Sequence, residues 1–206
     1  MAPRSKDDPP PLAMRPQGSA GRAFGVLMEL INTPAYGFAL DLLDIQPSSD
    51  VLEIGFGTGR LIELLLQRTE GRVFGLDPTP TMLAVAKTKA GVRRAGDRVS
   101  LKLGGDADLG GLPPLDRVVA AHSFLFWPDP QATARRLFAL LKPGGRVVLV
   151  LRDHSRHDSG WLPNPLSRDP EEPQAALRLF ESCGFTARLQ HRGGMTALAS
   201  DKYPLI

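Results

Sequence analysis

The sequence predicts one α/β domain in which helices cover both faces of a mostly parallel, doubly wound sheet. Three observations lead to this fold class. From residue 51 onward, short apolar runs typical of buried strands alternate with segments of helical periodicity. The chain has 206 residues, which is enough for one domain of this kind and too few for two comfortable ones. Two final apolar runs joined by Gly193-Gly194 predict an antiparallel hairpin at the carboxyl end.

The amino-terminal region divides into a tail and a helical cap. Residues 1–21 are rich in proline, glycine and charge, and we expect a disordered tail there. Residues 22–46 carry apolar residues at helical spacing and form the expected cap. Because proline interrupts helices, Pro34 predicts a break before a second helical segment that runs through Leu43. The apolar residues of the first segment are Phe24, Leu27, Met28 and Ile31.

Residues 47–152 form the expected core, with five strands and three helices in alternation. The strands are expected at 51–54, 72–76, 99–103, 115–121 and 146–151. The helices are expected at 58–68, 80–91 and 130–141. Thr79-Pro80 and Asp129-Pro130 each place a capping residue before a proline, which is typical of a helix start. The Lys-Pro-Gly-Gly run at 142–145 ends the third helix before the fifth strand.

Residues 153–206 are expected to supply a loop, one helix and the closing hairpin. The helix is predicted at 173–183 and the two strands at 185–191 and 195–200, which brings the sheet to seven strands. His154 and His157 in the loop have no cysteine and no third histidine nearby. We therefore predict no metal site, and we interpret this loop, with Trp161, as a substrate-side lid.

Composition excludes several classes of function. Hydrophobic residues make up 42% of the chain and charged residues 23%, but no uncharged apolar run approaches the ~18 residues of a membrane span. The single cysteine, Cys183, excludes an internal disulfide and fits a cytoplasmic protein, as does the lack of a recognisable signal peptide. The net charge of +3 is scattered, so a nucleic-acid partner is not expected.

The strongest functional signal is a glycine turn after the first strand. Gly55, Gly57 and Gly59 form the pattern G-x-G-x-G, which lets a backbone turn tightly and approach a ligand closely. Dinucleotide-binding folds favour G-x-G-x-x-G, whereas Arg60 stands where the third glycine of that pattern belongs. Glu53, two residues before the first glycine, is suited to a cationic amine rather than to a pyrophosphate.

This segment resembles motif I of the class I S-adenosylmethionine-dependent methyltransferases, in which an acidic residue precedes G-x-G-x-G. The resemblance implies a Rossmann-like fold and S-adenosylmethionine as cofactor, with S-adenosylhomocysteine as product. It also implies that the glycine turn packs against the methionine part of the cofactor and that Glu53 holds its amino group.

Two further acids match positions of that family. Asp77 follows the second strand and corresponds to the acid that binds both ribose hydroxyls, although it also suits a helix cap. Asp106 corresponds to the acid that accepts from the adenine amino group, with the Ala107 backbone amide reading a ring nitrogen. Asp108 is a rival for that position, and an ordinary turn acid is the alternative. The resemblance also assigns further cofactor contacts to Phe56, Pro78, Met82 and His122.

Residues 118–130, which lead out of the fourth strand, resemble a ubiquinone/menaquinone-methylase-like subgroup that often reads N-T-x-Y-F-W-x-D-P. His122 stands where asparagine is common in that subgroup. It is the candidate catalytic base, because an unperturbed imidazole titrates near neutral pH. The alternative is that His122 packs or hydrogen-bonds against the cofactor carboxylate. Aromatic residues expected as walls of a substrate chamber are Phe124, Phe126 and Trp127.

The sequence therefore predicts transfer of a methyl group to a small-molecule acceptor, with no membrane span and no nucleic-acid partner. Two alternatives remain: a cofactor-binding partner subunit without turnover, and a nicotinamide-dependent oxidoreductase. The acceptor and the oligomeric state are not predicted.

Overall fold

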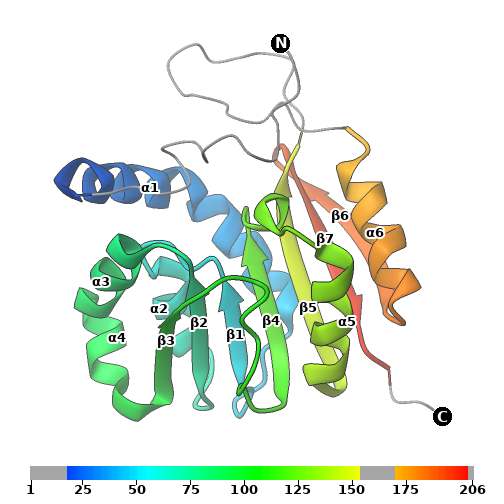
Figure 1. The fold of residues 1–206 in the computed structure, drawn as a ribbon, viewed down its shortest axis with the longest axis horizontal. Helices are drawn as coiled ribbons and strands as arrows, with labels where there is room; N and C mark the ends of the chain where they lie inside the picture. Colours follow the sequence, from blue (N-terminus) through cyan, green and yellow to red (C-terminus); the bar gives the residue numbers. More distant parts are fainter. Residues whose placement is uncertain (1–17, 154–169, 204–206) are drawn as a thin grey trace.

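A computed structural model describes residues 18–153 and 170–203 of the chain. Its centre is one seven-stranded sheet with the order β3-β2-β1-β4-β5-β7-β6 (Figure 1). The first five strands in the chain pair in parallel, and β7 is antiparallel to both β5 and β6. The predicted fold class and the closing hairpin are therefore confirmed. The strands are β1 (Val51–Ile54), β2 (Val73–Asp77), β3 (Val99–Leu103), β4 (Leu115–Ala121), β5 (Leu141–Arg152), β6 (Thr186–Arg192) and β7 (Met195–Asp201).

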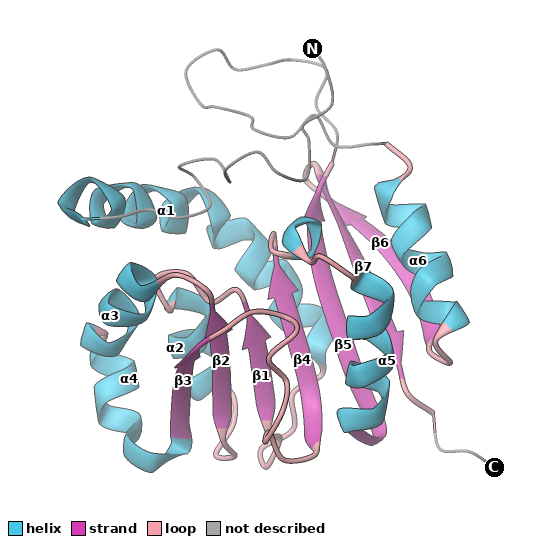
Figure 2. Ribbon diagram, in the orientation of Figure 1, coloured by secondary structure: helices cyan, strands magenta, loops and turns pink. Residues whose placement is uncertain are grey.

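Helices form a layer on each face of this sheet, as Figure 2 shows. The helices are α1 (Gly18–Leu43), α2 (Arg60–Leu66), α3 (Pro80–Thr88), α4 (Ala90–Ala95), α5 (Pro130–Leu140) and α6 (Glu172–Ser182), with short 3₁₀ turns at Gly96–Arg98 and Phe124–Phe126. Residues of α1 to α4 share one buried apolar cluster, and residues of α5 and α6 share the other. Successive strand residues alternate between the clusters: Val51 belongs to the first, and Leu52 belongs to the second.

The predicted break at Pro34 is wrong, because α1 continues through it as one helix. Because Pro34 has no N–H, the Leu30 carbonyl group loses its intrahelical hydrogen bond. Both residues are exposed, so water can replace that bond. Burial of Ala35, Phe38 and Leu43 against the sheet stabilises the helix beyond that point.

The boundaries of several elements also differ from the prediction, most clearly in two helices and one strand. The helix expected at 58–68 begins only at Arg60, because Gly57 and Gly59 both adopt positive φ. The helix expected at 80–91 ends at Thr88, and a separate α4 follows because Lys89 adopts an extended ψ of 135°. Strand β5 begins at Leu141, which already pairs with β4 ahead of a shift in register.

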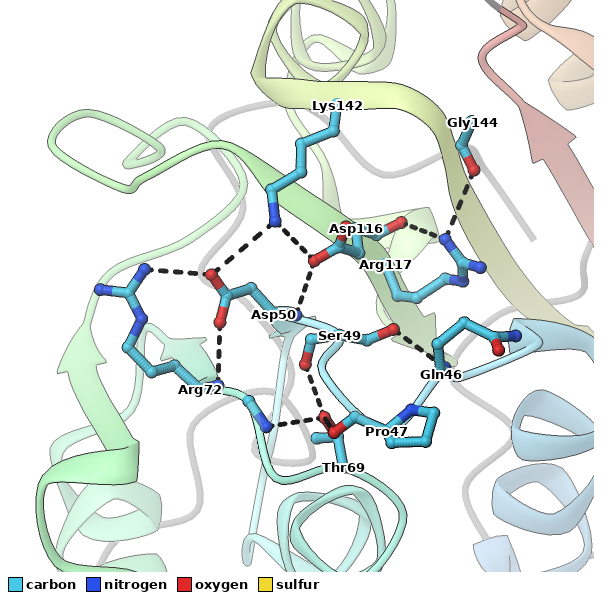
Figure 3. A network of polar contacts seen from close by, with 11 residues as sticks. Gln46, Pro47, Ser49, Asp50, Thr69, Arg72, Asp116, Arg117, Lys142 and Gly144 are labelled. Atoms are coloured by element: carbon cyan, nitrogen blue, oxygen red, sulfur yellow. Dashed lines mark hydrogen bonds and ion pairs between the residues drawn. The ribbon is translucent and has the colours of Figure 1, made fainter.

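A network of polar contacts closes the amino edge of the sheet (Figure 3). The backbone N–H of Asp50, before β1, donates to Asp116 Oδ2 at 2.8 Å, and Lys142 Nζ donates to the same oxygen at 2.7 Å. Arg72 donates to Asp50 through its backbone and its guanidinium. These contacts tie together the amino ends of four parallel strands, which leaves the carboxyl edge for a ligand.

None of the helices in the described ranges has both the length and the apolar character needed to cross a membrane.

Candidate functional site

The glycine turn lies at the carboxyl end of β1, and its three glycines have different roles. All three adopt positive φ. A Cβ on Gly55 would lie 2.5 Å from Ser123 Cβ, and one on Gly59 would lie 2.8 Å from Ala86 Cβ. These two glycines therefore make room for protein atoms, after β4 and on α3 respectively. A Cβ on Gly57 would meet nothing within 4 Å, so this glycine faces open space. The expected close approach of a ligand is thus available at Gly57.

Asp77, at the end of β2, holds this turn in place. Its Oδ2 accepts a hydrogen bond from the Gly57 backbone N–H at 2.8 Å, and its Oδ1 accepts from the Thr79 backbone N–H at 2.9 Å. Burial raises the pKa of Asp77, and the two backbone donors oppose that rise. Both carboxylate oxygens keep a further lone pair, so the capping arrangement is compatible with the expected ribose contact.

Glu53 is the least compensated charged group at this edge. Its side chain is 2% exposed, and its Oε2 has no hydrogen-bond partner among the residues that the structure describes. Burial raises the pKa of Glu53 well above its ordinary value, and the neighbouring Asp77 raises it further. A buried carboxyl group of this kind is stabilised by a cation, and the turn beside it is open at Gly57. The residues present therefore fit a ligand that carries an amine.

The sequence analysis missed three polar residues of α1, here named the α1 polar stripe: Glu29, Asn32 and Tyr36. They recur at i, i+3 and i+7, so they share one face of the helix. That spacing in an otherwise apolar helix was the available signal. Burial raises the pKa of the Tyr36 hydroxyl, and the charge of Glu53 raises it further. The Glu53 carboxyl group therefore acts electrostatically on this face of α1.

Glu29 connects the stripe to the glycine turn. Its Oε2 accepts from the Thr58 hydroxyl at 2.7 Å and from Lys89 Nζ at 2.7 Å. The ion pair and these hydrogen bonds lower the pKa of Glu29, although its partial burial alone would raise it. One carboxylate thus joins α1, the turn after β1 and the junction of α3 with α4.

The acid proposed for adenine recognition lies after β3 and is buried. Asp106 Oδ2 accepts from the Thr133 hydroxyl of α5 at 2.6 Å, and burial raises the pKa of Asp106. Its rival Asp108 accepts from the Gly105 backbone N–H at 2.8 Å and so closes its own turn. Ala107 is exposed between them. The structure thus separates the two acids: Asp106 is anchored to α5, and Asp108 shapes the loop.

His122 follows β4 in an unusual backbone conformation. Its φ is 58°, in the left-handed region that few non-glycine residues adopt. Its backbone N–H donates to the Val150 carbonyl oxygen of β5 at 2.9 Å. The next residue, Ser123, donates its hydroxyl to the Ile54 carbonyl oxygen of β1 at 2.6 Å. His122 is thereby held where β1, β4 and β5 end, and strained residues of this kind concentrate at functional sites.

The remaining predicted site residues lie in different environments. Phe56 is buried in the α1-side core, Met82 is buried on α3, and Pro78 is exposed. Phe124 and Trp127 pack edge-to-face with ring centroids 5.1 Å apart, within the α5-side core. Of the three aromatic residues expected as chamber walls, the exposed one is Phe126.

His154, His157 and Trp161 lie outside the described residues. Within the ranges that the structure covers, no group of three or more His, Cys, Asp or Glu side chains is placed to hold a metal ion.

Comparison with known protein families gives a match to a methyltransferase domain over residues 52–147. The chain is 36% identical over 115 residues to nocamycin O-methyltransferase of Saccharothrix syringae, covering 54% of this chain and 40% of that protein. It is 33% identical over 117 residues to demethylmenaquinone methyltransferase of Thermus thermophilus, covering 54% of this chain and 51% of that one. The match thus spans about half or less of the length of these relatives.

Solved structures share the whole fold at low sequence identity. A putative methyltransferase from Haloferax volcanii, solved with the activator Trm112, has a TM-score of 0.73 at 18% identity, over 88% of this chain and 95% of that one. A S-adenosylmethionine-dependent methyltransferase from Aquifex aeolicus has a TM-score of 0.69 at 17% identity, over 86% and 98% respectively. At this identity the likeness shows the fold alone.

Proposed function

We propose that this chain is a relative of the class I S-adenosylmethionine-dependent methyltransferases, a premise that rests on its sequence and its fold. On that premise, it transfers a methyl group from S-adenosylmethionine to a small-molecule acceptor. The family match and the fold support the premise. The relatives named as methyltransferases of nocamycin and demethylmenaquinone support a small-molecule acceptor. We further propose that the protein acts in the cytoplasm.

The observation that carries this proposal is the buried Glu53 carboxyl group beside the open space at Gly57. We assign the cofactor amino group to Glu53, the ribose hydroxyls to Asp77, and the adenine amino group to Asp106 with the Ala107 amide. These residues lie near the carboxyl ends of β1, β2 and β3, which are neighbours in the sheet: Glu53 is within β1, Asp77 is the last residue of β2, and Asp106 follows β3. A nucleoside with an amino-acid tail would therefore extend along the edge in the order adenine, ribose, amine. Pro78 and Met82 would border the ribose, Phe56 would support the turn from inside, and His122 would face the tail.

The mechanism requires little chemistry from the protein. When bound, the cofactor supplies a methyl group already activated by the sulfonium. The chain must orient the acceptor behind that methyl carbon and exclude water, and orientation of this kind contributes about 7–11 kcal/mol. Glu53 and Asp77 fix the position of the cofactor, and α1 covers it through Glu29. His122 would accept a proton from an acceptor hydroxyl or amine.

Binding measurements on the full chain test the proposal. We expect isothermal titration calorimetry to detect S-adenosylhomocysteine and no binding of NADH. The reverse result would instead support the oxidoreductase alternative. Cofactor binding without labelled product, in a broad acceptor screen with methyl-labelled S-adenosylmethionine, would support the partner subunit that lacks turnover.

We also propose that the chain is organised into the regions expected from the sequence. We assign residues 22–46 to a cap, 47–152 to the cofactor-binding core, and 153–206 to the acceptor side and the hairpin. The expected tail at 1–21 lies mostly outside the described residues, and its last four residues belong to α1.

A further inference from the structure

Strand order limits where the acceptor binds, if the proposed function holds. The cofactor assignments above occupy the ends of β3, β2 and β1. The next strands along the sheet are β4 and β5. His122 follows β4, and Arg152 is the last residue of β5. Because β4 and β5 pair in parallel, with Ala121 opposite Val150, both residues project from the same edge of the sheet. The acceptor therefore meets the ends of these two strands.

Arg152 lies on the α1 side of that edge. It pairs in register with Met195 of β7, which belongs to the α1-side core. Its guanidinium Nη2 donates to Asn32 Oδ1, in the α1 polar stripe, at 3.3 Å. Asn32 shares one face of α1 with Glu29, three residues earlier, and Glu29 accepts from the Thr58 hydroxyl of the glycine turn. Polar side chains of one helix face thus lie between the glycine turn and the Arg152 guanidinium.

The charge of Arg152 is not neutralised by any described residue. Its contact with Asn32 is to a neutral amide, and no carboxylate of the described ranges lies within ion-pair distance of it. Arg192, the other arginine that flanks Met195, contrasts with it. Its Nη1 pairs with Asp41 Oδ2 at 2.6 Å, and its guanidinium lies 4.5 Å from the Phe38 ring centroid. Both arginines are exposed, but Arg192 is paired with a carboxylate of α1, whereas Arg152 contacts an amide of that helix.

We propose that Arg152 binds a carboxylate of the methyl acceptor, so that the substrates of this protein are carboxylic acids. This inference rests on the proposed function. A guanidinium binds a carboxylate through two parallel N–H donors, and Asn32 pre-orients the group without neutralising it. Since no carboxylate of the described residues pairs with it, the single positive charge of Arg152 matches a singly charged carboxylate better than a doubly charged phosphate monoester. Arg152 thereby selects the acceptor by charge and positions it next to His122.

The test uses the full chain saturated with S-adenosylhomocysteine. The probes are aromatic and aliphatic carboxylic acids, each paired with its primary amide, and binding is followed by calorimetry and by the Arg152 Nε–Hε signal in nitrogen-15 NMR spectra. We expect at least one acid to bind and to shift this signal, with its amide at least tenfold weaker. The Arg152→Gln substitution should weaken binding of that acid at least tenfold and leave the affinity for S-adenosylhomocysteine within twofold. Arg135→Gln, which removes an exposed charge from α5, is the matched control and should change neither.

Three outcomes would overturn the inference while the proposed function stands. The first is binding of S-adenosylhomocysteine with no preference for any acid over its amide. The second is an acid preference that survives Arg152→Gln. The third is a tenfold loss of S-adenosylhomocysteine affinity in Arg152→Gln, which would assign this arginine to the carboxylate of the cofactor instead. Failure of the wild-type chain to bind S-adenosylhomocysteine would overturn the proposed function itself.

Discussion

At the scale of single residues, Glu53 has opposite effects on stability and on binding. Its pKa in the folded protein lies above the ordinary 4.5, so the folded state holds the proton more tightly than the unfolded state does. Stability is therefore lost as the pH rises from 4.5 through the raised value. Above that value the ionised carboxylate remains buried. It then destabilises the ligand-free protein, but it favours the binding of a cationic ligand.

Glu53→Gln should consequently stabilise the free protein and weaken cofactor binding. At about pH 8 we expect a higher Tm, by about 2–4 °C for each kcal/mol gained, and a difference that disappears as the pH falls below 4.5. Loss of a charged hydrogen bond of about 1.5–3 kcal/mol should weaken S-adenosylhomocysteine about ten- to a hundredfold. Calorimetry and thermal melts across the pH range measure both effects. Glu181→Gln, on the exposed side of α6, is the control. A variant with unchanged affinity would remove Glu53 from the proposed site.

Asp77→Ala should weaken S-adenosylhomocysteine about ten- to a hundredfold, since a charged acceptor of the ribose hydroxyls is lost. The variant also leaves the N–H groups of Gly57 and Thr79 without their acceptor. Asp77→Asn removes the charge but retains one carbonyl oxygen that can accept from a backbone N–H. Comparing its affinity with that of Asp77→Ala separates the effect of lost charge from the effect of a disrupted turn. Asp97→Ala removes an exposed acid far from the turn and serves as control. A calorimetric affinity of Asp77→Ala within threefold of the wild type contradicts the ribose role.

His122→Asn distinguishes the two roles considered for this histidine. Asparagine tolerates the left-handed φ of 58°, so the fold should be retained with little change in Tm. If His122 is the base, kcat should fall about a hundredfold or more, and the acidic limb of the pH–rate profile should disappear. A role limited to contact with the cofactor predicts weaker S-adenosylmethionine binding with kcat unchanged. Unchanged turnover eliminates the base proposal.

At the scale of elements, α1 is held over the glycine turn by the Glu29–Lys89 pair. Both side chains are about four-fifths buried at this contact, 18% and 21% exposed. The same helix is held at its carboxyl end by Arg192 with Asp41, and by Arg146, which donates to the Leu42 carbonyl oxygen at 2.9 Å. The middle of α1 is therefore fixed to the junction of α3 with α4, and its carboxyl end is fixed to β5 and β6.

Glu29→Gln should increase local opening of α1 around residue 29 without unfolding the helix. A partly exposed pair contributes up to about 1 kcal/mol, so we expect two- to fivefold faster amide hydrogen exchange near residue 29 and faster release of S-adenosylhomocysteine. Lys89→Gln should give the same change, because it breaks the same ion pair. Exchanging the two charges, with Glu29→Lys and Lys89→Glu together, should restore part of the protection. Exchange rates that do not change in either single variant would show that this pair does not hold the helix.

Prediction from sequence succeeded where short-range signals were sufficient. Strand–helix alternation and the glycine pair at 193–194 gave the strands, their class of pairing and the hairpin. It failed where tertiary contacts decided the outcome. Burial against the sheet carries α1 through Pro34. The partner of Gly55 is Ser123, 68 positions later in the chain, and no local pattern reveals that contact. The α1 polar stripe was missed for the same reason, since its partners lie on β1, β5 and the junction of α3 with α4.

At the scale of the whole molecule, the two edges of the sheet have separate tasks. The amino edge is closed by ion pairs and backbone contacts, as Figure 3 shows. Its most buried cation is Arg117, 8% exposed, which donates to the carbonyl oxygens of Asp44, Asp116 and Gly144. Burial lowers the pKa of Arg117, and the nearby Asp44 opposes that effect. The carboxyl edge keeps a buried carboxyl group without a cation.

Arg117→Ala should therefore lower stability and spare cofactor binding. Three part-buried carbonyl groups lose their donor, and the packing of the buried Arg117 side chain is lost. We expect a loss of about 2–4 kcal/mol in the free energy of unfolding. The affinity for S-adenosylhomocysteine, measured well below the lowered Tm, should stay within twofold of the wild type, since the network lies at the opposite edge. Arg135→Ala is the control for loss of an exposed arginine. A large loss of affinity at constant fold would show that the edges are coupled.

The packing of α1 against the sheet has a consequence for how the chain folds. Ala35, Phe38 and Leu42 pack in one cluster with Met195, Ala197 and Ala199 of β7. The apolar side of α1 packs on β4, β5 and β7, so it is fully covered only once β7 has been synthesised. Until the ribosome releases that strand, part of this apolar side remains exposed to chaperones and to unwanted association. Contacts so far apart in sequence also slow folding, so the docking of α1 onto β7 is expected to be a late step.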